Sequence, residues 1–392
     1  MTDAGSGFGG RNLPYGVLAD GHVVVAYGEA AIDLAHLGGF DVGKDVFASG
    51  SLNAFMSLGP DAWARTRSEL SARLDALPAS SLRDRSELDL VLPFDVADYV
   101  DFYASIEHAC AMGRLLRPDG DPLPAAFRYL PMGYHGRAAT IIASGAAIPR
   151  PSGLVRDGEG CVQYRRSARL DVEVELGFVV GVGSPRSRPI SATDAHRHVF
   201  GLVLLNDWSA RDIQALEYQP LGPFLGKSFA TSISPWVVPL AAVAPFAVEG
   251  PPQDPPPASH LVAHEPRNFD IALSLELNGT VIATTNARHL YWSMAQQLAH
   301  LTSNGAATRT GDLFASGTIS GRDARSAGSL MELTSSGRDP IELDDGSTRS
   351  WLDDGDEVVI RGWAGPTGDG ERISLGEVRG RVVANADEEV EP

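Results

Sequence analysis

The sequence predicts a mostly β (α+β) fold in two parts: a small β-rich unit over residues 1–92 and a larger, mixed β domain over residues 93–392. Short apolar segments bounded by glycine, proline or asparagine recur along the chain, which is typical of strands joined by turns. Helical patterns are few, which disfavours a doubly wound parallel sheet. A polar segment at residues 80–89 separates the two parts, and 43% hydrophobic residues are enough to build full cores.

In the N-terminal unit, we expect strands at residues 13–18 and 22–27, separated by the turn residues Asp20 and Gly21. One helix follows, with Asp61 as its expected N-cap. The apolar stripe of this helix is formed by Trp63, Leu70, Leu74 and Leu77.

In the larger domain, residues 170–181 predict one continuous strand, because apolar side chains alternate with acidic ones before the segment becomes wholly apolar. Residues 271–277 and 280–283 predict a hairpin around an Asn-Gly pair, which is preferred in type I′ turns. A helix is expected to end at Gly305 and to pack on the core through its apolar residues Leu290, Met294, Leu298 and Leu301.

The composition narrows the classes of partner. The formal net charge is −18 without any lysine-rich patch, so nucleic acid and anionic membranes are not expected to bind. Two cysteines, Cys110 and Cys161, cannot form a disulfide framework and suit a reducing compartment. The N-terminus lacks signal-peptide features, and prolines break the longest apolar segment. The sequence therefore predicts a soluble, cytoplasmic protein.

Residues 206–231 concentrate polar side chains directly after an apolar run at residues 199–205. Asp207 is expected at a strand end, where functional side chains are common. Ser209 and Asp212 match a capping box, which predicts a helix that ends at Pro220. On this helix one face would carry Arg211, Gln214 and Tyr218.

Lys227 follows this helix and is one of only two lysines, the other being Lys44, among 32 basic Lys and Arg residues. Since arginine fills nearly every other cationic position, a lysine here indicates a need for a compact or deprotonatable ammonium group. Chance survival under biased codon usage is the alternative.

Acidic side chains at residues 171, 173 and 175 share one face of the predicted strand. The Cα atoms of Glu173 and Glu175 would lie about 6.6 Å apart, so the two charges repel unless water screens them or a cation sits between them. Together with Asp207 they predict an oxygen-rich site for Mg²⁺ or Ca²⁺, whereas a solvated strand edge is the simpler alternative. Among ten histidines, His108 is the best candidate for a general base, although a lone histidine is more often structural.

Six segments together carry a family resemblance: residues 101–108, 133–137, 170–175, 206–231, 317–321 and 328–332. In this order they resemble the fumarylacetoacetase family, and the resemblance extends from about residue 12 to residue 384. It implies a homodimer with a small SH3-like N-terminal barrel and a mixed β-roll catalytic domain. The implied reaction is hydrolysis of 4-fumarylacetoacetate to fumarate and acetoacetate, the last step of tyrosine and phenylalanine catabolism.

The resemblance also implies roles for individual residues. The divalent ion, Mg²⁺ or Ca²⁺, would be held by Asp101, Glu173, Glu175 and Asp207, with Lys227 and Thr231 close to it. His108 would activate water, oriented by Glu332, and the developing negative charge would be stabilised by Arg211, Gln214 and Lys227. The substrate would be held by Tyr103, Arg117, Gln214, Tyr218 and Thr318, with Tyr134 as a weaker candidate. Ala230 departs from the family pattern, where glycine is expected, so local strain would follow if that position required positive φ.

Other interpretations fit less well. The segment around Ser228 lacks the final glycine of a nucleophile elbow, and residues 222–228 have one residue too few for a phosphate loop. Acylpyruvate hydrolysis or 2-keto acid decarboxylation on the same metal site is a closer alternative. A non-catalytic metal-binding scaffold would have no use for His108, Glu332 and Lys227.

Overall fold

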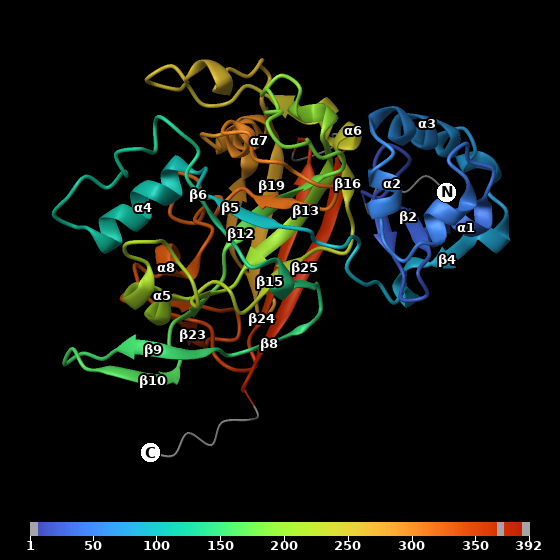
Figure 1. Cartoon of the computed structure of the whole chain (residues 1–392). Helices are drawn as coiled ribbons and strands as arrows, with labels where there is room; N and C mark the ends of the chain where they lie inside the picture. Colours follow the sequence, from blue (N-terminus) through green and yellow to red (C-terminus); the bar gives the residue numbers. More distant parts are fainter. Residues whose placement is uncertain (1–6, 367–371, 386–392) are drawn as a thin grey trace.

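The computed structural model of the chain describes residues 7–366 and 372–385. The N-terminal part contains a four-stranded antiparallel sheet in the order β1-β2-β3-β4 with short helices around it (Figure 1). Its elements are β1 (Tyr15–Val17), β2 (Val23–Tyr27), β3 (Ala30–Asp33), α1 (Leu34–Leu37), α2 (Asn53–Met56), α3 (Pro60–Ser71) and β4 (Leu82–Asp84).

The larger part is built on a curled eight-stranded main sheet in the order β6-β5-β21-β12-β13-β15-β7, with β16 paired to β13. Most neighbouring strands are antiparallel, but β21 pairs with β5, and β15 with β7, in parallel. The strands are β5 (Tyr99–Phe102), β6 (Gly133–His135), β7 (Ile141–Ala143), β12 (Val174–Val180), β13 (Val199–Asp207), β15 (Thr231–Ile233), β16 (Val238–Pro239) and β21 (Leu313–Ala315).

A second sheet, in the order β20-β19-β24-β25-β8, packs on one face of the main sheet. The contact is close: a Cβ on Gly362 of β24 would lie 2.7 Å from Leu204 of β13. The strands are β8 (Ala147–Pro149), β19 (Ile271–Leu277), β20 (Thr280–Asn286), β24 (Glu357–Ala364) and β25 (Ile373–Val383).

The other face of the main sheet shares a core with the N-terminal unit. On β13, Leu202 and Leu204 belong to the cluster with the second sheet, whereas Val203 and Leu205 belong to the cluster with the N-terminal unit. Tyr15 of β1 packs against Phe200 at a ring-centroid distance of 5.5 Å. Burial on both faces explains why residues 199–205 are continuously apolar rather than alternating.

Helices and short ladders surround these sheets, with α4, α5 and α8 on the side away from the N-terminal unit (Figure 1). The remaining helices and short strands are α4 (Ile106–Leu116), α5 (Arg211–Glu217), α6 (Leu240–Val243), α7 (Met294–Thr302), α8 (Leu330–Leu333), β9 (Ser152–Arg156), β10 (Val162–Arg166), β11 (Leu170–Asp171), β14 (Ser209–Ala210), β17 (Ala247–Val248), β18 (Asn268–Phe269), β22 (Ile341–Glu342) and β23 (Thr348–Arg349). Within the described residues, no helix is both long and apolar enough to cross a bilayer.

The predicted hairpin is confirmed as β19 and β20. Its turn residues Asn278 and Gly279 both have positive φ, 50° and 86°, as a type I′ turn requires. The predicted helix ending at Gly305 is confirmed as α7, which is shorter and ends at Thr302. The predicted single strand at residues 170–181 is wrong, because it divides into β11 and β12, with Glu173 bridged to Ser329 instead.

Both predicted N-caps are wrong. Helix α3 begins with Pro60 after Gly59, so Asp61 lies in the first turn, where a carboxylate still favours the helix dipole. Helix α5 has Ala210 at its N-cap position and ends at Glu217, three residues before Pro220.

The Ser209–Asp212 capping box does not form because both side chains have tertiary partners. Ser209 donates to the Asp207 carbonyl oxygen at 3.0 Å, and Asp212 accepts from the Ser167 hydroxyl at 2.6 Å and the Ala168 N–H at 2.8 Å.

Asp33 organises the polar side of the N-terminal sheet. Its Oδ2 accepts from Nδ1 of His22 and Nδ1 of His36, each at 2.9 Å, and from Nη2 of Arg83 at 2.6 Å. Burial alone would raise the pKa of Asp33, but these hydrogen bonds and one from the His36 backbone lower it far below its ordinary value. The ionised carboxylate therefore stabilises the folded state.

We expect Asp33→Asn to lower the free energy of unfolding by about 2–4 kcal/mol at neutral pH, because it removes the buried carboxylate that accepts hydrogen bonds from Arg83, His22 and His36. Since the folded-state pKa is depressed, the stabilisation is complete above the ordinary aspartate pKa of about 4 and is lost as the pH falls through the lowered value. Thermal unfolding at neutral and acidic pH measures this. The gap between wild type and variant should narrow in acid, and Asp20→Asn, at an exposed partner of Arg83, should have little effect.

Candidate active site

Three carboxylates from three strands converge on one face of the main sheet: Asp101 of β5, Glu175 of β12 and Asp207 of β13. Alternation along each strand places them on the face that also carries Tyr99, Val203 and Leu205. One oxygen from each carboxylate lies within 4.8 Å of the others, and the three side chains are at most 4% exposed.

Several oxygens of this triad have no hydrogen-bond partner in the described chain, although they are buried: both oxygens of Glu175 and Oδ1 of Asp101. Burial, followed by the neighbouring carboxylates, raises the pKa of Asp101 and of Glu175 well above the usual range. Buried carboxylates are normally paired, so these open oxygens fit a bound cation. A purely oxygen ligand set suits a hard divalent ion.

Lys227 borders the triad and bonds to two acids. Its Nζ donates to Glu173 Oε2 and, at 2.6 Å, to Asp207 Oδ2. Burial would lower the pKa of Lys227, but Asp207 and then Glu173 raise it above its ordinary value. These two carboxylates favour the ammonium form of Lys227 over the deprotonated amine. Thr231 donates to the second Asp207 oxygen at 3.0 Å.

Glu173 lies between two cations and outside the triad. Its Oε1 accepts from Nη2 of Arg211 at 2.7 Å, while its Oε2 contacts Lys227. Burial would raise the pKa of Glu173, but Lys227, Arg211 and then His108 lower it below its usual range. Of the four predicted metal ligands, three thus share one group of converging oxygens, and the fourth is paired with cations.

Arg211 begins α5 and is oriented by three acceptors. Its Nε donates to Asp171 at 2.7 Å, its Nη2 to Glu173, and its Nη1 to the Gln214 amide oxygen at 3.1 Å. Although burial would lower the pKa of Arg211, the two carboxylates raise it. Arg211 and Gln214 therefore meet as the helical spacing predicted.

The five buried acids outnumber the two buried bases of this region by three charges. The acids are Asp101, Asp171, Glu173, Glu175 and Asp207, and the bases are Arg211 and Lys227. A divalent cation would offset most of this excess, whereas an empty site must retain protons.

His108 lies in the first turn of α4, and its Nδ1 is 2.7 Å from Oε2 of Glu332. Both side chains are almost completely buried. Burial would raise the pKa of Glu332, but His108 and hydrogen bonds from Ser329 and Ser320 lower it. The ionised Glu332 therefore accepts a hydrogen bond from Nδ1–H of His108. Nε2 is then the ring nitrogen that can act as a base.

The predicted substrate residues are only partly connected to this cluster. The ring of Tyr103 packs edge-on against His108 at 5.3 Å. Tyr134 donates to Asp207 at 3.2 Å. Within the described chain, Arg117, Tyr218 and Thr318 form no hydrogen bond or ion pair with the cluster. Arg117 instead donates to the Pro122 carbonyl, and Tyr218 accepts from Gln219.

Asp171 was missed as a site residue. Besides Arg211, it accepts from the backbone N–H groups of Leu330 and Met331 at 2.7 and 3.2 Å, so it ties Arg211 to the helix that carries Glu332. The alternation of acidic residues in the sequence included Asp171, but it gave no sign that Asp171 would bond to Arg211 and to the backbone of α8. Ser329, three residues before Glu332, has capping-box spacing that sequence reasoning could have used: Ser329 caps α8 and donates to Glu332 at 2.7 Å.

Ala230 causes no backbone strain. It is absent from the described non-glycine residues that have positive φ, and its side chain is 3% exposed within the main core. The methyl group is therefore ordinary core packing.

Comparison with known proteins identifies the family. Two family models match consecutive parts of the chain: "Fumarylacetoacetase N-terminal" over residues 11–98 and "Fumarylacetoacetate (FAA) hydrolase C-terminal" over residues 99–383. The chain is 44% identical to the fumarylacetoacetases of Rattus norvegicus and Homo sapiens and 42% identical to that of Arabidopsis thaliana, with 95% of each chain covered. The chain belongs to the fumarylacetoacetase family.

Solved structures show the same fold at lower identity. A fumarylacetoacetate hydrolase from Exiguobacterium antarcticum aligns with a TM-score of 0.58 and 16% identity, over 95% of this chain and 100% of that one. A maleylpyruvate hydrolase from Sphingobium, solved with manganese(II) and pyruvate, aligns with a TM-score of 0.55 and 15% identity, over 95% of this chain and 99% of that one. The mixed fold with its curled sheet is thus shared with the fumarylacetoacetase family.

Proposed function

We propose that this chain hydrolyses the carbon–carbon bond of 4-fumarylacetoacetate to fumarate and acetoacetate, the last step of tyrosine and phenylalanine catabolism. The family match over nearly the whole chain supports this substrate. The observation that carries the proposal is the buried His108–Glu332 pair beside a carboxylate cluster that holds Arg211 and Lys227.

In this reaction water attacks one carbonyl carbon, the carbon–carbon bond beside it breaks, and the enolate that leaves takes up a proton on carbon to give acetoacetate. His108 takes the water proton on Nε2, while Glu332 holds Nδ1–H and stabilises the imidazolium that forms. The environment of this pair supports the role: Tyr103 packs on the imidazole, and Glu332 is itself fixed by Ser320 and Ser329.

Arg211 and Lys227 supply the positive charge for the developing oxyanion and the leaving enolate. Both are buried and held by carboxylates, so their donors are preorganised before the substrate arrives. Gln214, bonded to Arg211, is proposed as a further amide donor to the substrate. Tyr103, Arg117, Tyr218 and Thr318 are proposed to complete the substrate site.

Asp101, Glu175 and Asp207 are proposed as ligands of Mg²⁺ or Ca²⁺, with Glu173 as a fourth ligand and Lys227 and Thr231 beside it. The unpaired oxygens of Asp101 and Glu175 fit this role. When bound, the metal would supply Lewis acidity toward the 1,3-dicarbonyl.

The finer organisation is proposed on the family resemblance: an SH3-like N-terminal barrel over residues 1–92, a catalytic domain over residues 93–392, a homodimer and a cytoplasmic location. The four-stranded N-terminal sheet is compatible with such a barrel.

Removal of the metal should abolish activity. We expect loss of fumarylacetoacetate absorbance, with fumarate formed, by the purified protein in Mg²⁺, none after EDTA treatment, and recovery on adding Mg²⁺ or Ca²⁺. Turnover of simple acylpyruvates without turnover of fumarylacetoacetate would support the proposed metal site but contradict the proposed substrate. Undiminished turnover in the metal-free protein, verified by elemental analysis, would overturn the metal requirement.

A further inference from the structure

Asp171 is a buried acid outside the proposed catalytic and metal-binding groups. Its side chain has no exposed surface, and it ends the short strand β11. It is not one of the three acids, Asp101, Glu175 and Asp207, whose oxygens converge. A buried carboxylate destabilises the fold unless its oxygens are paired, so the partners of Asp171 indicate what it does.

The first partner of Asp171 is the guanidinium group of Arg211. Oδ2 of Asp171 accepts from Nε at 2.7 Å, and Glu173 accepts from Nη2 at 2.7 Å. Nη1 instead donates to the uncharged amide of Gln214, at 3.1 Å. Two carboxylates therefore fix the Nε–Nη2 edge of the guanidinium, and this orients the Nη1 end toward Gln214 before a substrate binds.

The second partner of Asp171 is helix α8. The N–H groups of Leu330 and Met331, the first two residues of α8, donate to Asp171 at 2.7 and 3.2 Å. Such N–H groups have no acceptor within their own helix, so the carboxylate satisfies them. The next residue of α8 is Glu332, which orients His108. A single carboxylate thus contacts both the proposed oxyanion donor and the helix that carries the base-orienting acid.

The backbone next to Asp171 is itself bonded to the segment before α8. The N–H of Val174 donates to the Gly328 carbonyl oxygen at 2.9 Å, and Glu173 forms a β-bridge with Ser329. Residues 171–174 therefore lie along the segment that leads into α8. Because these backbone bonds do not involve the Asp171 side chain, a substitution there should act on its hydrogen-bond partners rather than on the path of the chain.

We propose that Asp171 is a positioning residue for the hydrolysis, an inference that rests on the proposed function. It fixes the guanidinium of Arg211 relative to α8, so that the oxyanion donor and the His108–Glu332 pair keep one separation. Asp171 acts through these groups and does not itself touch the substrate. Such positioning matters, because a displacement of about 1 Å among catalytic groups can cost about 10²-fold in rate.

Asp171→Asn tests this role with little change in side-chain volume. The amide oxygen can still accept from the N–H groups of α8, but the amide NH₂ would face the Nε–H of Arg211, donor against donor. We expect kcat to fall at least about tenfold with KM close to that of wild type, because an oxyanion donor acts in the transition state. Asp212→Asn is the matched control, since Asp212 follows Arg211 on α5 but bonds to Ser167 and Ala168, and its kcat should be close to that of wild type.

A double-mutant cycle with Arg211→Ala separates positioning from a general structural role. Once the guanidinium is absent, Asp171→Asn should lower kcat by less than about a further twofold, because the group that Asp171 positions is gone. Losses that multiply would overturn the proposal, because Asp171 would then act independently of Arg211. If circular dichroism shows that Asp171→Asn is unfolded, Asp171→Ser, whose hydroxyl oxygen can accept from α8, takes its place in the cycle.

A measurement without substrate separates this proposal from the proposed function. In protein labelled with ¹⁵N-arginine, the Nε–H resonance of Arg211 is identified by its absence in Arg211→Lys. Its exchange with water should be slow, because its acceptor is buried, and at least about tenfold faster in Asp171→Asn but not in Asp212→Asn. An unchanged resonance in Asp171→Asn would overturn the positioning role, whereas a wild-type protein that turns over no diketo acid would overturn the proposed function.

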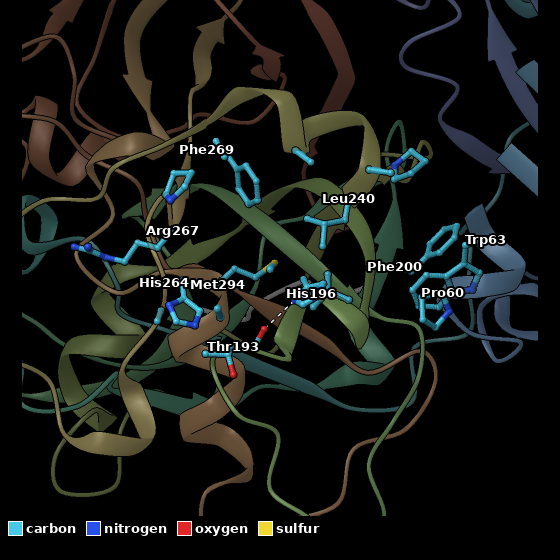
Figure 2. A pocket seen from close by; sticks show the side chains of 18 of the residues that line it. Pro60, Trp63, Thr193, His196, Phe200, Leu240, His264, Arg267, Phe269 and Met294 are labelled. Atoms are coloured by element: carbon cyan, nitrogen blue, oxygen red, sulfur yellow. Dashed lines mark hydrogen bonds between the residues drawn. The ribbon is translucent and has the colours of Figure 1, made fainter. Parts of the chain in front are cut away.

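A remote control comes from an apolar cavity of about 570 Å³ between the N-terminal unit and the larger domain (Figure 2). Trp63 and Phe200 lie in its wall, whereas Asp171 and Arg211 are not among the described residues that line it. Thr193→Ala, at an exposed position of this wall, should therefore change neither kcat nor the Arg211 resonance. A change of both would overturn the assignment, because the two properties would then respond to any disturbance of the fold.

Discussion

His108→Ala should lower the turnover of fumarylacetoacetate by at least about 10³-fold while the protein still binds its divalent ion. The loss follows from removing the only group proposed to take the water proton, and general bases typically contribute about 10²–10⁴-fold. Metal affinity should persist because the His108 ring nitrogen Nδ1 is bonded to Glu332 and not to the carboxylate triad. Initial rates and calorimetric titration with Mg²⁺ measure the two properties.

Glu332→Gln serves as a graded companion to this variant. It retains an oxygen that can accept from His108 but removes the charge that stabilises the imidazolium, so we expect an intermediate loss. His135→Ala, at an exposed histidine of β6, should be close to wild type. If His108→Ala lost metal binding together with activity, the histidine would be a metal ligand or a structural support. This result would contradict its proposed role as the general base.

Glu175→Gln should weaken divalent metal binding by about 100-fold or more. Both oxygens of Glu175 are buried without partners, so the carboxylate is available for a cation and for little else in the described structure. The amide retains the shape but not the charge, and a hard cation depends on ligand charge. Calorimetry with Mg²⁺ and with Ca²⁺ measures the affinity.

The same substitution should stabilise the metal-free protein. In the absence of metal, burial and the neighbouring carboxylates raise the pKa of Glu175, so the folded protein must keep this side chain protonated at a cost in stability that the neutral glutamine does not have. We therefore expect a higher thermal midpoint for the metal-free variant than for the metal-free wild type, and a smaller rise on adding metal. Unchanged metal affinity would remove Glu175 from the proposed ligands.

The sequence predicted the fold where a pattern was local and strong. The Asn-Gly hairpin and the strand that ends at Asp207 depend on turn chemistry and on apolar periodicity, and both are confirmed. The predicted cap at Ser209 was wrong because capping depends on partners that a local pattern does not include: Asp212 bonds to Ser167, which lies 45 residues away. The cap at Asp61 was wrong for a local reason, because Pro60 already occupies the first helical position.

The site was predictable in its residue types but less so in its connections. His108 and Glu332 are 224 residues apart, and only the family resemblance joined them before the structure did. The alternation of acids suggested that Glu173 and Glu175 act together. In the structure the two glutamates have different partners, because the strand breaks between β11 and β12, where Glu173 bridges to Ser329 and bonds to Arg211. Strand periodicity contains no information about this break or about these partners.

The core shared by β13 and the N-terminal unit has a consequence for truncation. A shortened chain beginning near residue 93 would expose Phe200, Val203 and Leu205 to water along the middle of a sheet. Such a face invites self-association. The N-terminal unit is therefore a lid over apolar strands, and a shorter protein of this architecture would need polar side chains on that face to remain monodisperse.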